Sequence, residues 1–457
     1  MTLFVDLPWP ILLDSGHSKT NSYSNHHIDI IAAAPTKHLI SRNNTTYSKI
    51  CGKTDRKTNN NDHSEGYNEI DSTFFSALRS GLPRTTRHPN LDLYPIAPGW
   101  MGCLSYDLCK QLEHLPSTTS NDTNIPDAAF GFYEWVIATN HKTKTTCIIY
   151  IENANIVDVR HRLSLSGAPS SNTNPAQENF HLTSKFESDQ SKTSYQQKFK
   201  QIKDYILSGD TYQINFAQRF SAKYSGSSWD AYQTLRANNP APMGAFFATE
   251  DFQLLSLSPE RFIKVEDNQL TTSPIKGTRP RASDTKKDQQ NKEDLRSSPK
   301  DQAENLMIVD LLRNDFGKVC KEGSISVPFL FEIESFPNVH HLVSTITGTL
   351  NDSCDGIEAI KQGFPGGSIT GTPKVRAMEI IDEIESHHRS AYCGSMTYFN
   401  TMGACDSNIN IRTFVMKGES IHCWGGGGIV ADSVCEDEYQ ETFDKVERFL
   451  HALEKKR

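Results

Sequence analysis

The segment TYQINFAQRF, residues 211–220, alternates apolar and polar side chains with the two-residue period of a β-strand. Ile214 and Phe216 fall on one face of this predicted strand, whereas Gln213 and Asn215 fall on the other. A polar strand face inside a large protein either meets water or lines a site, and the segment alone leaves both readings open.

A helix is predicted directly before this strand, over residues 195–208. Phe199, Ile202 and Ile206 follow helical spacing, so they form an apolar stripe. Gly209 comes next and can adopt the left-handed conformation that often ends a helix.

A second helix is predicted over residues 299–315, PKDQAENLMIVDLLRND. Glu304, Ile308 and Leu311 share one face at i, i+4 and i+7, which puts a carboxylate in line with core residues. A buried Glu304 needs a cation, a hydrogen-bond donor or a raised pKa. The commoner arrangement for such a residue is the edge of the stripe, where the carboxylate reaches water.

A further helix is predicted near residues 436–454, where apolar side chains recur on one face from Tyr439 to Leu453. Glu441 lies off that stripe. Periodicity alone therefore places Glu441 on the solvated surface.

Two segments are rich in glycine. Residues 363–385, GFPGGSITGTPKVRAMEIIDEIE, predict a loop that runs into a helix, with Thr372 as N-cap and Pro373 at the first helical position. Residues 423–433, CWGGGGIVADS, hold four consecutive glycines whose bare amides can bind a carboxylate or a phosphate. Ordinary turn and bulge chemistry explains each segment equally well when it is taken alone.

Composition and charge exclude several classes of protein. The 457 residues are 36% hydrophobic and 22% charged, which fits a globular protein with a large core. The formal net charge of −8 argues against binding to nucleic acid, because proteins that bind a duplex are usually basic. We expect no membrane span, because no stretch approaches 18 consecutive apolar residues. The apolar start at residues 1–16 does not resemble a secretory signal, because it lacks a basic region and prolines interrupt it.

The ten cysteines are scattered, and none forms a C-x-x-C pair, so neither a zinc site nor a dithiol motif is indicated. We interpret each as a small buried apolar residue. Dispersed cysteines in a long chain fit a reducing compartment, and we expect a cytoplasmic protein.

Two polar stretches are predicted as loops or linkers, residues 41–69 and residues 164–194. The second stretch divides the chain into an N-terminal region, residues 1–185, and a C-terminal region, residues 190–455.

The segment TTSPIKGTRPR, residues 271–281, places Lys276 between Ile275 and Gly277, with a proline on each side. A lysine chosen at random is usually a solvated loop residue, because lysines are seldom buried. The residues of this segment alone therefore favour an exposed Lys276.

Eight motifs in this order resemble the chorismate-utilising family, which includes anthranilate synthase, aminodeoxychorismate synthase, isochorismate synthase and salicylate synthase. They cover residues of about 190–450 and read YQINFAQRF, SLSPERF, TSPIKGTRPR, AENLMIVDLLRND, SFPNVHHLVSTITG, GFPGGSITGTPK, NINIRTF and GGGGIVADSVCEDEYQET. In the N-terminal region, LPWPILLDSG at 7–16 and GWMGCLSYDLCKQLEHLP at 99–116 look like component I of aminodeoxychorismate synthase, and 41–69 looks like an insertion.

The resemblance implies an α/β (α+β) fold of two large, mostly antiparallel β-sheets that pack together and are flanked by helices. Residues 1–185 would contribute strands to this shared sandwich and to a tryptophan-type pocket. Residues 190–455 would form the chorismate-binding catalytic region.

The resemblance also implies the chemistry. Component I of aminodeoxychorismate synthase commonly has a lysine at the position of Lys276, where anthranilate synthases typically have alanine. Lys276 would attack C2 of chorismate and expel the C4 hydroxyl, and ammonia would then attack C4 and expel the lysine. Glu260, in SLSPERF, resembles the general acid that protonates the departing hydroxyl. A lysine nucleophile must be neutral, which burial favours.

The remaining site residues follow from the same resemblance. Glu304 and Glu441 match the carboxylates that hold Mg²⁺, with Glu438 behind them. Arg412, Tyr398 and the amides of Gly426 and Gly428 would bind the enolpyruvyl carboxylate of chorismate. Thr370, His341 and Gln213 map onto the same pocket, and Gln213 argues against isochorismate and salicylate synthases, which have a lysine there.

The LLDS element resembles a tryptophan pocket, and a bound L-tryptophan is implied. The candidate contacts of this pocket are Ser15, Tyr23, Ser24, Pro242, Met243 and Gly244.

We therefore expect amination of chorismate to 4-amino-4-deoxychorismate on the folate route, with ammonia from a separate glutamine amidotransferase subunit (component II). The nearest enzymatic alternative is anthranilate synthase component I. An alternative of another class is a non-catalytic, tryptophan-binding regulatory protein.

Overall fold

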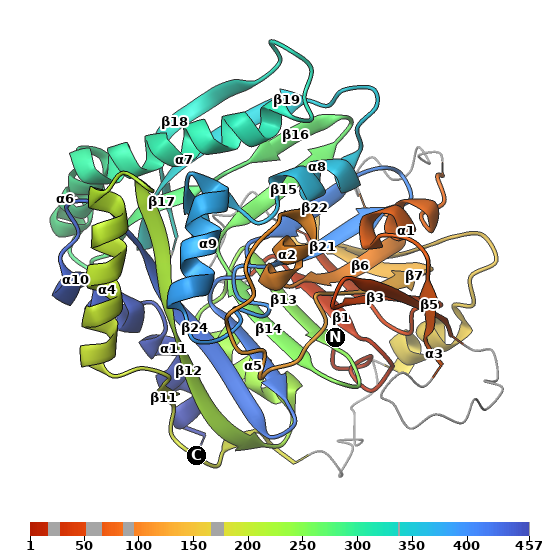
Figure 1. Ribbon diagram of the computed structural model, residues 1–457. Coiled ribbons are helices and arrows are strands. Elements are labelled where there is room, and N and C mark those ends of the chain that lie inside the picture. Colours follow the sequence, from red (N-terminus) through yellow and green to blue (C-terminus); the bar gives the residue numbers. More distant parts are fainter. Residues whose placement is uncertain (17–27, 52–65, 86–95, 166–177, 337–338, 457) are drawn as a thin grey trace.

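We describe the fold from a computed structural model, which covers residues 1–16, 28–51, 66–85, 96–165, 178–336 and 339–456. Within these ranges, two large antiparallel β-sheets pack against each other and helices flank them (Figure 1). The predicted two-sheet α/β architecture is therefore confirmed.

The first sheet contains 12 strands among the described residues. Its main path runs β10 (His181–Leu182), β12 (Gln213–Ser225), β24 (Ser420–Ile429), β23 (Thr413–Lys417), β14 (Gln253–Ser258), β13 (Met243–Ala248), β1 (Ile11–Asp14), β2 (Ile28–Ala32), β8 (Trp135–Asn140) and β9 (Thr145–Tyr150). Two short strands, β11 (Glu187–Ser188) and β20 (Gly371–Thr372), also pair with β12.

The second sheet likewise has 12 strands in the described part of the chain. Its main path runs β17 (Ile275–Pro280), β19 (Val339–Thr349), β16 (Gln269–Thr272), β15 (Arg261–Glu266), β22 (Cys405–Asn408), β21 (Ser395–Asn400), β6 (Gly99–Leu104), β7 (Ala128–Tyr133), β3 (Lys37–Arg42), β4 (Thr45–Ile50) and β5 (Asn68–Ile70). A further strand, β18 (Ser326–Ser335), pairs with β19.

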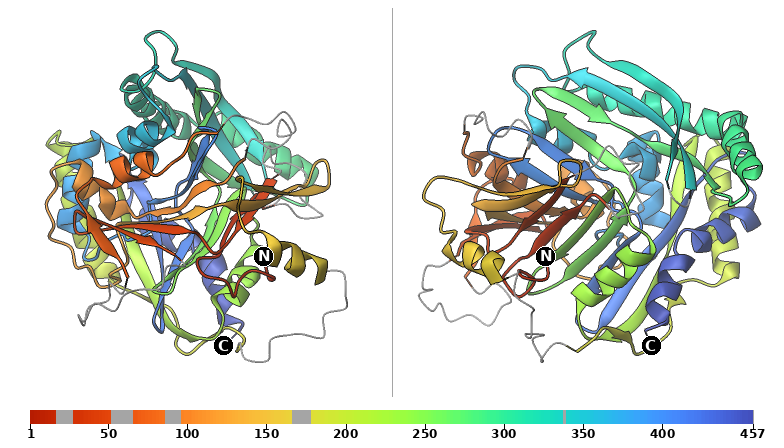
Figure 2. Two further views of the ribbon diagram at one scale, coloured as in Figure 1. Left: turned by 90° about the vertical axis from the view of Figure 1, so that its right-hand side faces the viewer. Right: turned by 180° about the vertical axis from the view of Figure 1, so that it is seen from behind.

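In both sheets the strands from the first 150 residues lie together at one end, and strands from later in the chain form the rest (Figure 2). In the first sheet β1 pairs with β13, with Ile11 opposite Phe247. In the second sheet β6 pairs with β21, with Trp100 opposite Phe399. The N-terminal strands thus extend both sheets from a single junction in each, and β9 and β5 form the outer edges.

The helices pack on the faces and edges of the sheets (Figure 1). They are α1 (Phe74–Ser80), α2 (Cys109–Leu112), α3 (Val157–Leu165), α4 (Lys192–Leu207), α5 (Ser228–Asn238), α6 (Thr285–Arg296), α7 (Pro299–Gly317), α8 (Gly356–Gly363), α9 (Lys374–Ile384), α10 (Cys435–Asp444) and α11 (Glu447–Glu454). Two short 3₁₀ helices, η2 (Tyr106–Leu108) and η3 (Gly367–Ile369), interrupt loops.

Residues 213–220 of strand β12 are buried on both faces. Ile214 and Phe216 lie in an apolar cluster with Ile202 of α4 and Ile380 of α9, so two helices cover this face of the strand. On the opposite face Gln213 is fully buried. The polar face of TYQINFAQRF therefore does not meet bulk water.

Three local predictions are wrong. The helix expected over 436–454 is two helices, α10 and α11, which break at Lys445 and Val446, because an apolar stripe can continue through a break. Thr372 belongs to strand β20 and Pro373 takes the N-cap position, one residue later than predicted. The stretch 41–69 is not simply a loop, since β3 and β4 form a hairpin across residues 37–50.

None of the helices in the described ranges is long and apolar enough to cross a membrane. All ten cysteines are free thiols. Six of them are buried as predicted, whereas Cys51, Cys147, Cys354 and Cys435 are only half-buried.

Candidate active site

Lys276 lies in strand β17 rather than in a solvated loop. The pairing of β17 with β19 shifts register between Lys276 and Thr278, so Gly277 forms a bulge. Gly277 has a φ of +70°, and a Cβ there would lie 2.9 Å from the Asp301 side chain. A glycine must therefore follow the lysine, because any other residue would be strained and would move Lys276.

The amine of Lys276 points into the protein. Its Nζ donates a 3.2 Å hydrogen bond to the carbonyl oxygen of Ser368. Burial lowers the pKa of Lys276, although the carboxylates of Glu304 and Glu260 act in the opposite direction. The neutral amine therefore forms at a lower pH than in an ordinary lysine.

Glu260 lies in the turn between β14 and β15, and its side chain is 4% exposed. The hydroxyl of Ser368 donates to Glu260 Oε1 at 2.8 Å. Burial raises the pKa of Glu260, while the Ser368 bond and the charge of Lys276 partly oppose this. The lowered pKa of Lys276 and the raised pKa of Glu260 both favour the uncharged form of each group. A neutral amine beside a protonated acid avoids two buried charges.

Two carboxylates of α10 lie beside Gly425–Gly428 of β24 (the glycine strand), and Glu304 of α7 is close enough to Glu441 for their charges to interact. Glu304 of α7 is 19% exposed, and burial raises its pKa. A Cβ on Gly427 would lie 3.1 Å from Oε2 of Glu438 and 3.2 Å from Oε1 of Glu441, so both side chains of α10 meet the strand at this residue. Glycine is needed here to leave room for them.

Lys445 compensates one of these carboxylates. Its Nζ lies 2.6 Å from Glu441 Oε1 and also donates to the carbonyl oxygen of Gly426 at 2.7 Å. Burial alone would raise the pKa of Glu441, but Lys445 outweighs it and the pKa is lowered. Glu441 is 45% exposed, so it is less buried than Glu304.

In the part of the chain that the structure describes, no three acidic, His or Cys side chains converge closely enough to form a metal site of protein ligands alone. Oxygen donors from two carboxylates suit Mg²⁺, which keeps several waters and takes few protein ligands. The donor set of Glu304 and Glu441 fits that ion.

The amides of Gly426 and Gly428 face the open edge of β24. Asn215 and Ala217 of β12 donate their amides away from β24, to Thr370 O at 2.7 Å and to a Glu385 carboxylate oxygen at 3.0 Å. Asn215 is therefore opposite Gly428, and Ala217 opposite Gly426, as non-hydrogen-bonded pairs of the antiparallel ladder. The two glycine amides must point to the other edge, which β23 covers up to Cys423.

Arg412 lies close enough to both Glu260 and His341 for its charge to affect their titration. Within the described ranges the Arg412 guanidinium has no hydrogen-bond or ion-pair partner, and burial lowers its pKa while Glu260 raises it. A half-buried cation without a protein partner suits an anionic ligand. The Nδ1 atom of His341 hydrogen-bonds to Thr278 Oγ1 at 2.9 Å, and burial together with the Arg412 charge lowers the pKa of His341 to about 3.

Gln213 and Thr370 lie where β12 meets the loop that leads into β20. Gln213 is fully buried, and among the described residues neither atom of its side-chain amide has a partner. A Cβ on Gly428 would lie 2.8 Å from Gln213 Nε2, so this amide sits against the glycine strand. Thr370 is also buried, and its hydroxyl donates to the carbonyl oxygen of Gly366 at 3.1 Å.

Tyr398 is the predicted site residue that the structure ties least to the others. It lies in β21, is 7% exposed and pairs with Asp406 of β22. Burial raises the pKa of its phenol, followed by the charge of Asp406. The charge of Arg261, which follows Glu260 in the chain, acts in the opposite direction and lowers the pKa of Tyr398.

Four of the residues predicted to contact tryptophan, Ser15, Pro242, Met243 and Gly244, lie where β1 meets β13. Asp14 pairs with Gly244 across the two strands, which brings Ser15 close to Pro242 and Met243. The amide and hydroxyl of Ser15 both donate to Asp29 Oδ1, at 2.8 and 2.6 Å. Tyr23 and Ser24 lie outside the described residues.

Sequence reasoning did not single out Ser368 or Lys445. Ser368 stands within the GGSITG segment, but its spacing gives no sign that it contacts both Glu260 and Lys276. Lys445 lies four residues after Glu441, and that i,i+4 spacing was a usable signal for a pair on one helix face.

Comparisons with known proteins place the chain in a family. Residues 15–451 match the family model described as chorismate binding enzyme. The chain is 44% identical to aminodeoxychorismate synthase component 1 of Escherichia coli (strain K12), over 98% of this chain and 94% of that protein. It is 43% identical to the protein of the same name from Salmonella typhimurium, with the same coverage of both chains.

The structure is similar to the crystal structure of anthranilate synthase component I from Streptococcus pneumoniae TIGR4, with a TM-score of 0.80 and 28% identity. That match covers 95% of this chain and 94% of the other. The motif resemblance, the family model and the near full-length relatives agree, and the chain belongs to the family of chorismate binding enzymes.

Proposed function

We propose that this chain aminates chorismate at C4 and yields 4-amino-4-deoxychorismate. The observation that carries the proposal is the pairing of Lys276 with Glu260 through Ser368. Burial favours a neutral amine on Lys276 and a protonated carboxyl on Glu260. The names of the two enterobacterial relatives support the same activity.

In the first step the neutral amine of Lys276 forms a bond to C2 of chorismate. The ring double bonds shift, and the bond between C4 and the hydroxyl oxygen breaks. Glu260 donates its proton, so the hydroxyl departs as water and the carboxyl becomes a carboxylate. The product is a secondary ammonium that links Lys276 to C2.

In the second step ammonia forms a bond to C4, the double bonds shift back, and the bond between C2 and Lys276 breaks. The new ammonium at C4 returns a proton to the carboxylate of Glu260. The sum is chorismate plus ammonia giving 4-amino-4-deoxychorismate plus water. The ammonia would come from glutamine through a separate amidotransferase subunit, component II, as the words "component 1" in the names of the relatives suggest.

The substrate would be held by its two carboxylates. We assign the enolpyruvyl carboxylate to Arg412, which has a half-buried guanidinium without a protein partner in the described chain, and to the amides of Gly426 and Gly428. Gln213 would supply its unpartnered amide to the pocket. His341, Thr370 and Tyr398 would complete the walls.

We assign Mg²⁺ to Glu304 and Glu441, with Glu438 behind them, hydrogen-bonded by Ser433 at 2.7 Å. When bound, this ion supplies positive charge for the ring carboxylate of chorismate. Lys445 would hold Glu441 ionised and so ready to bind the ion.

We also propose that L-tryptophan binds at the corner of Ser15, Pro242 and Met243. Half-buried Pro242 and Met243 stand beside the strand end that carries Ser15, which supports a small ligand there. Equilibrium dialysis with labelled L-tryptophan tests this independently of turnover, and an absence of binding would remove this proposal alone.

The decisive experiment is a product assay with chorismate, Mg²⁺ and ammonium. We expect 4-amino-4-deoxychorismate, and we expect the chain to act in the cytoplasm. Fluorescent anthranilate with released pyruvate would instead show an anthranilate synthase. A chain that binds L-tryptophan but consumes no chorismate, even with component II supplied, would be a non-catalytic binding protein.

A further inference from the structure

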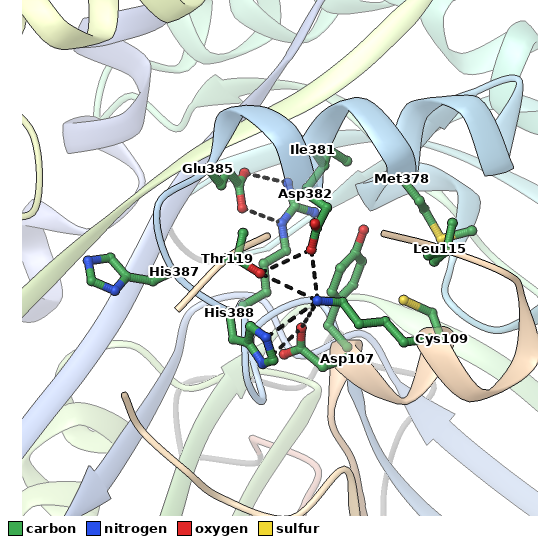
Figure 3. Close-up of a pocket in the computed structure, with 13 residues that line it drawn as sticks. Asp107, Cys109, Leu115, Thr119, Met378, Ile381, Asp382, Glu385, His387 and His388 are labelled. Carbon is green, nitrogen blue, oxygen red and sulfur yellow. Dashed lines mark hydrogen bonds and ion pairs between the residues drawn. The ribbon is translucent and has the colours of Figure 1, made fainter. Parts of the chain in front are cut away.

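A fully buried ion pair lies behind the proposed site. Arg389 is 1% exposed, and its Nε and Nη2 atoms donate to the two carboxylate oxygens of Glu385, at 2.9 and 2.7 Å. Glu385 follows the last residue of α9 and stands at the upper end of the pocket in Figure 3. Neither residue belongs to a motif used above to assign chemistry.

This ion pair completes the edge of strand β12. Strand β20 pairs with Gln213 and Ile214, and β11 pairs with Phe220 and Ser221, which leaves a gap between them. In that gap Arg389 Nη2 donates to the carbonyl oxygen of Asn215 at 2.6 Å. Glu385 accepts from the amide of Ala217 at 3.0 Å. The two side chains therefore satisfy strand groups that a neighbouring strand would otherwise satisfy.

The same guanidinium also holds the loop that contacts Lys276. Arg389 Nη1 donates to the carbonyl oxygen of Ile369 at 2.9 Å, and the amide of Asn215 donates to Thr370 O at 2.7 Å. Ile369 and Thr370 follow directly after Ser368. The backbone after Ser368 is thus fixed from two sides by Arg389 and β12.

The far side of the ion pair is packed rather than open. The guanidinium lies 4.9 Å from the ring centroid of Tyr106, a favourable cation–π distance. The pocket beside it has a volume of about 10 Å³, room for no more than one water. Within it Lys110 pairs with Asp382 at 2.7 Å (Figure 3). This pocket is too small for chorismate, so we assign the ion pair a positioning role rather than a ligand.

We propose that Arg389 is a positioning residue for the amination reaction: through Ile369 it fixes Ser368, and Ser368 in turn fixes Glu260 and Lys276. The inference rests on the proposed function, because it assigns the reacting groups to Lys276 and Glu260. A shift of about 1 Å in a reacting group costs on the order of 10²-fold in rate. Losing the contact to Ile369 should therefore reduce turnover without removing any group that touches substrate.

The test compares Arg389→Lys with Arg219→Lys. Arg219 is a matched control, because it is 6% exposed, lies on β12 and binds Asp122 through two hydrogen bonds of 2.7 and 2.8 Å. We expect Arg389→Lys to lower kcat on the order of 10²-fold, with a change in the chorismate KM of less than about threefold. In the pH–rate profile of Arg389→Lys, the loss of activity at high pH should occur at a higher pH than in the unchanged chain. The reason is that a displaced Ser368 no longer lowers the pKa of Glu260. Arg219→Lys should leave kcat, the chorismate KM and the pH dependence unchanged.

A double variant, Arg389→Met with Glu385→Gln, keeps the test valid if the single variant does not fold. It removes both charges together, so no unpaired charge stays buried. We expect the same loss of kcat and the same shift of the alkaline limb. Equal kinetics for this variant, Arg219→Lys and the unchanged chain would overturn the inference.

Hydrogen–deuterium exchange separates this inference from the proposed function. Residues 364–372 should exchange faster in the Arg389 variants than in Arg219→Lys, whatever reaction the chain performs. Unchanged exchange there would contradict the positioning role. A chain that makes no 4-amino-4-deoxychorismate would contradict the proposed function. Faster exchange in the Arg389 variants of such a chain would still support the positioning role of Arg389.

Discussion

The hydroxyl of Ser368 donates a 2.8 Å hydrogen bond to Oε1 of Glu260, while the carbonyl oxygen of the same serine accepts from Lys276 at 3.2 Å. One residue thus contacts both reacting groups through different atoms. The hydroxyl bond favours the ionised form of Glu260, and it opposes the burial that raises the pKa of that carboxyl. Ser368 therefore tunes the acid and orients the amine.

Ser368→Ala should move the alkaline limb of the pH–rate profile to higher pH. The reaction needs protonated Glu260, so the rate falls as the pH rises through the pKa of this carboxyl. Loss of the hydroxyl bond raises that pKa further, because the bond lowers it. The measurement is kcat/KM against pH, with Ser297→Ala on the exposed end of α6 as control. A limb that stays in place, or moves to lower pH, would show that Ser368 does not act on Glu260.

Lys276→Ala should abolish the amination. The methyl side chain cannot form the bond to C2, so any remaining turnover should come from direct addition of ammonia there. Intact-mass spectrometry should show a chorismate-derived adduct on the unchanged chain and none on the variant. Lys287→Ala, on the exposed face of α6, is the control and should keep both the adduct and the product. An adduct that persists in Lys276→Ala would place the nucleophile elsewhere.

Lys445→Met should move the acid limb of the profile to higher pH. Lys445 lowers the pKa of Lys276 by charge repulsion, so its removal raises that pKa. The neutral amine then forms only at higher pH, and the activity below that point is lost. The profile of Lys455→Met, an exposed lysine at the end of α11, should match that of the unchanged chain. An acid limb that moves to lower pH would contradict the assignment.

Long periodic elements could be predicted from the sequence, and so could the strand that carries Gln213. The helix expected over 195–208 is α4, Lys192–Leu207, and that over 299–315 is α7, Pro299–Gly317. Both carry apolar stripes that a single sequence shows directly. Motif resemblance supplied the site residues, since Glu304 and Glu441 come from helices that are far apart in the chain.

Other features depend on tertiary contacts that no pattern displays. The break between α10 and α11 falls within a continuous apolar stripe, so hydrophobic periodicity predicts one uninterrupted helix there. The polar residues of β3 and β4 look like a loop, but the hairpin forms because β3 pairs with β7. Arg389 follows two histidines in the sequence, a setting typical of a surface residue. It is nevertheless buried, because Glu385 and the carbonyl oxygens of Asn215 and Ile369 accept its hydrogen bonds.

Glu304→Gln and Glu441→Gln should each weaken Mg²⁺ binding by at least about tenfold, because an amide oxygen lacks the negative charge that the ion prefers. Titration with Mn²⁺ as a spectroscopic probe measures this without turnover. Glu447→Gln is the control, since Glu447 on α11 is 56% exposed. Unchanged Mn²⁺ affinity in both variants would show that these carboxylates do not hold the ion.

Ile202→Ala should destabilise the fold by about 2–5 kcal/mol, the usual cost of truncating a buried large aliphatic side chain. Ile202 is fully buried between α4, α9 and β12, so the variant leaves a cavity in the cluster that supports the polar face of β12. Leu207→Ala on the same helix is the control, because Leu207 is 74% exposed and its loss should cost less than about 0.5 kcal/mol. Urea denaturation of both variants gives the comparison. Equal midpoints would mean that the packing of α4 against β12 does not stabilise the sheet.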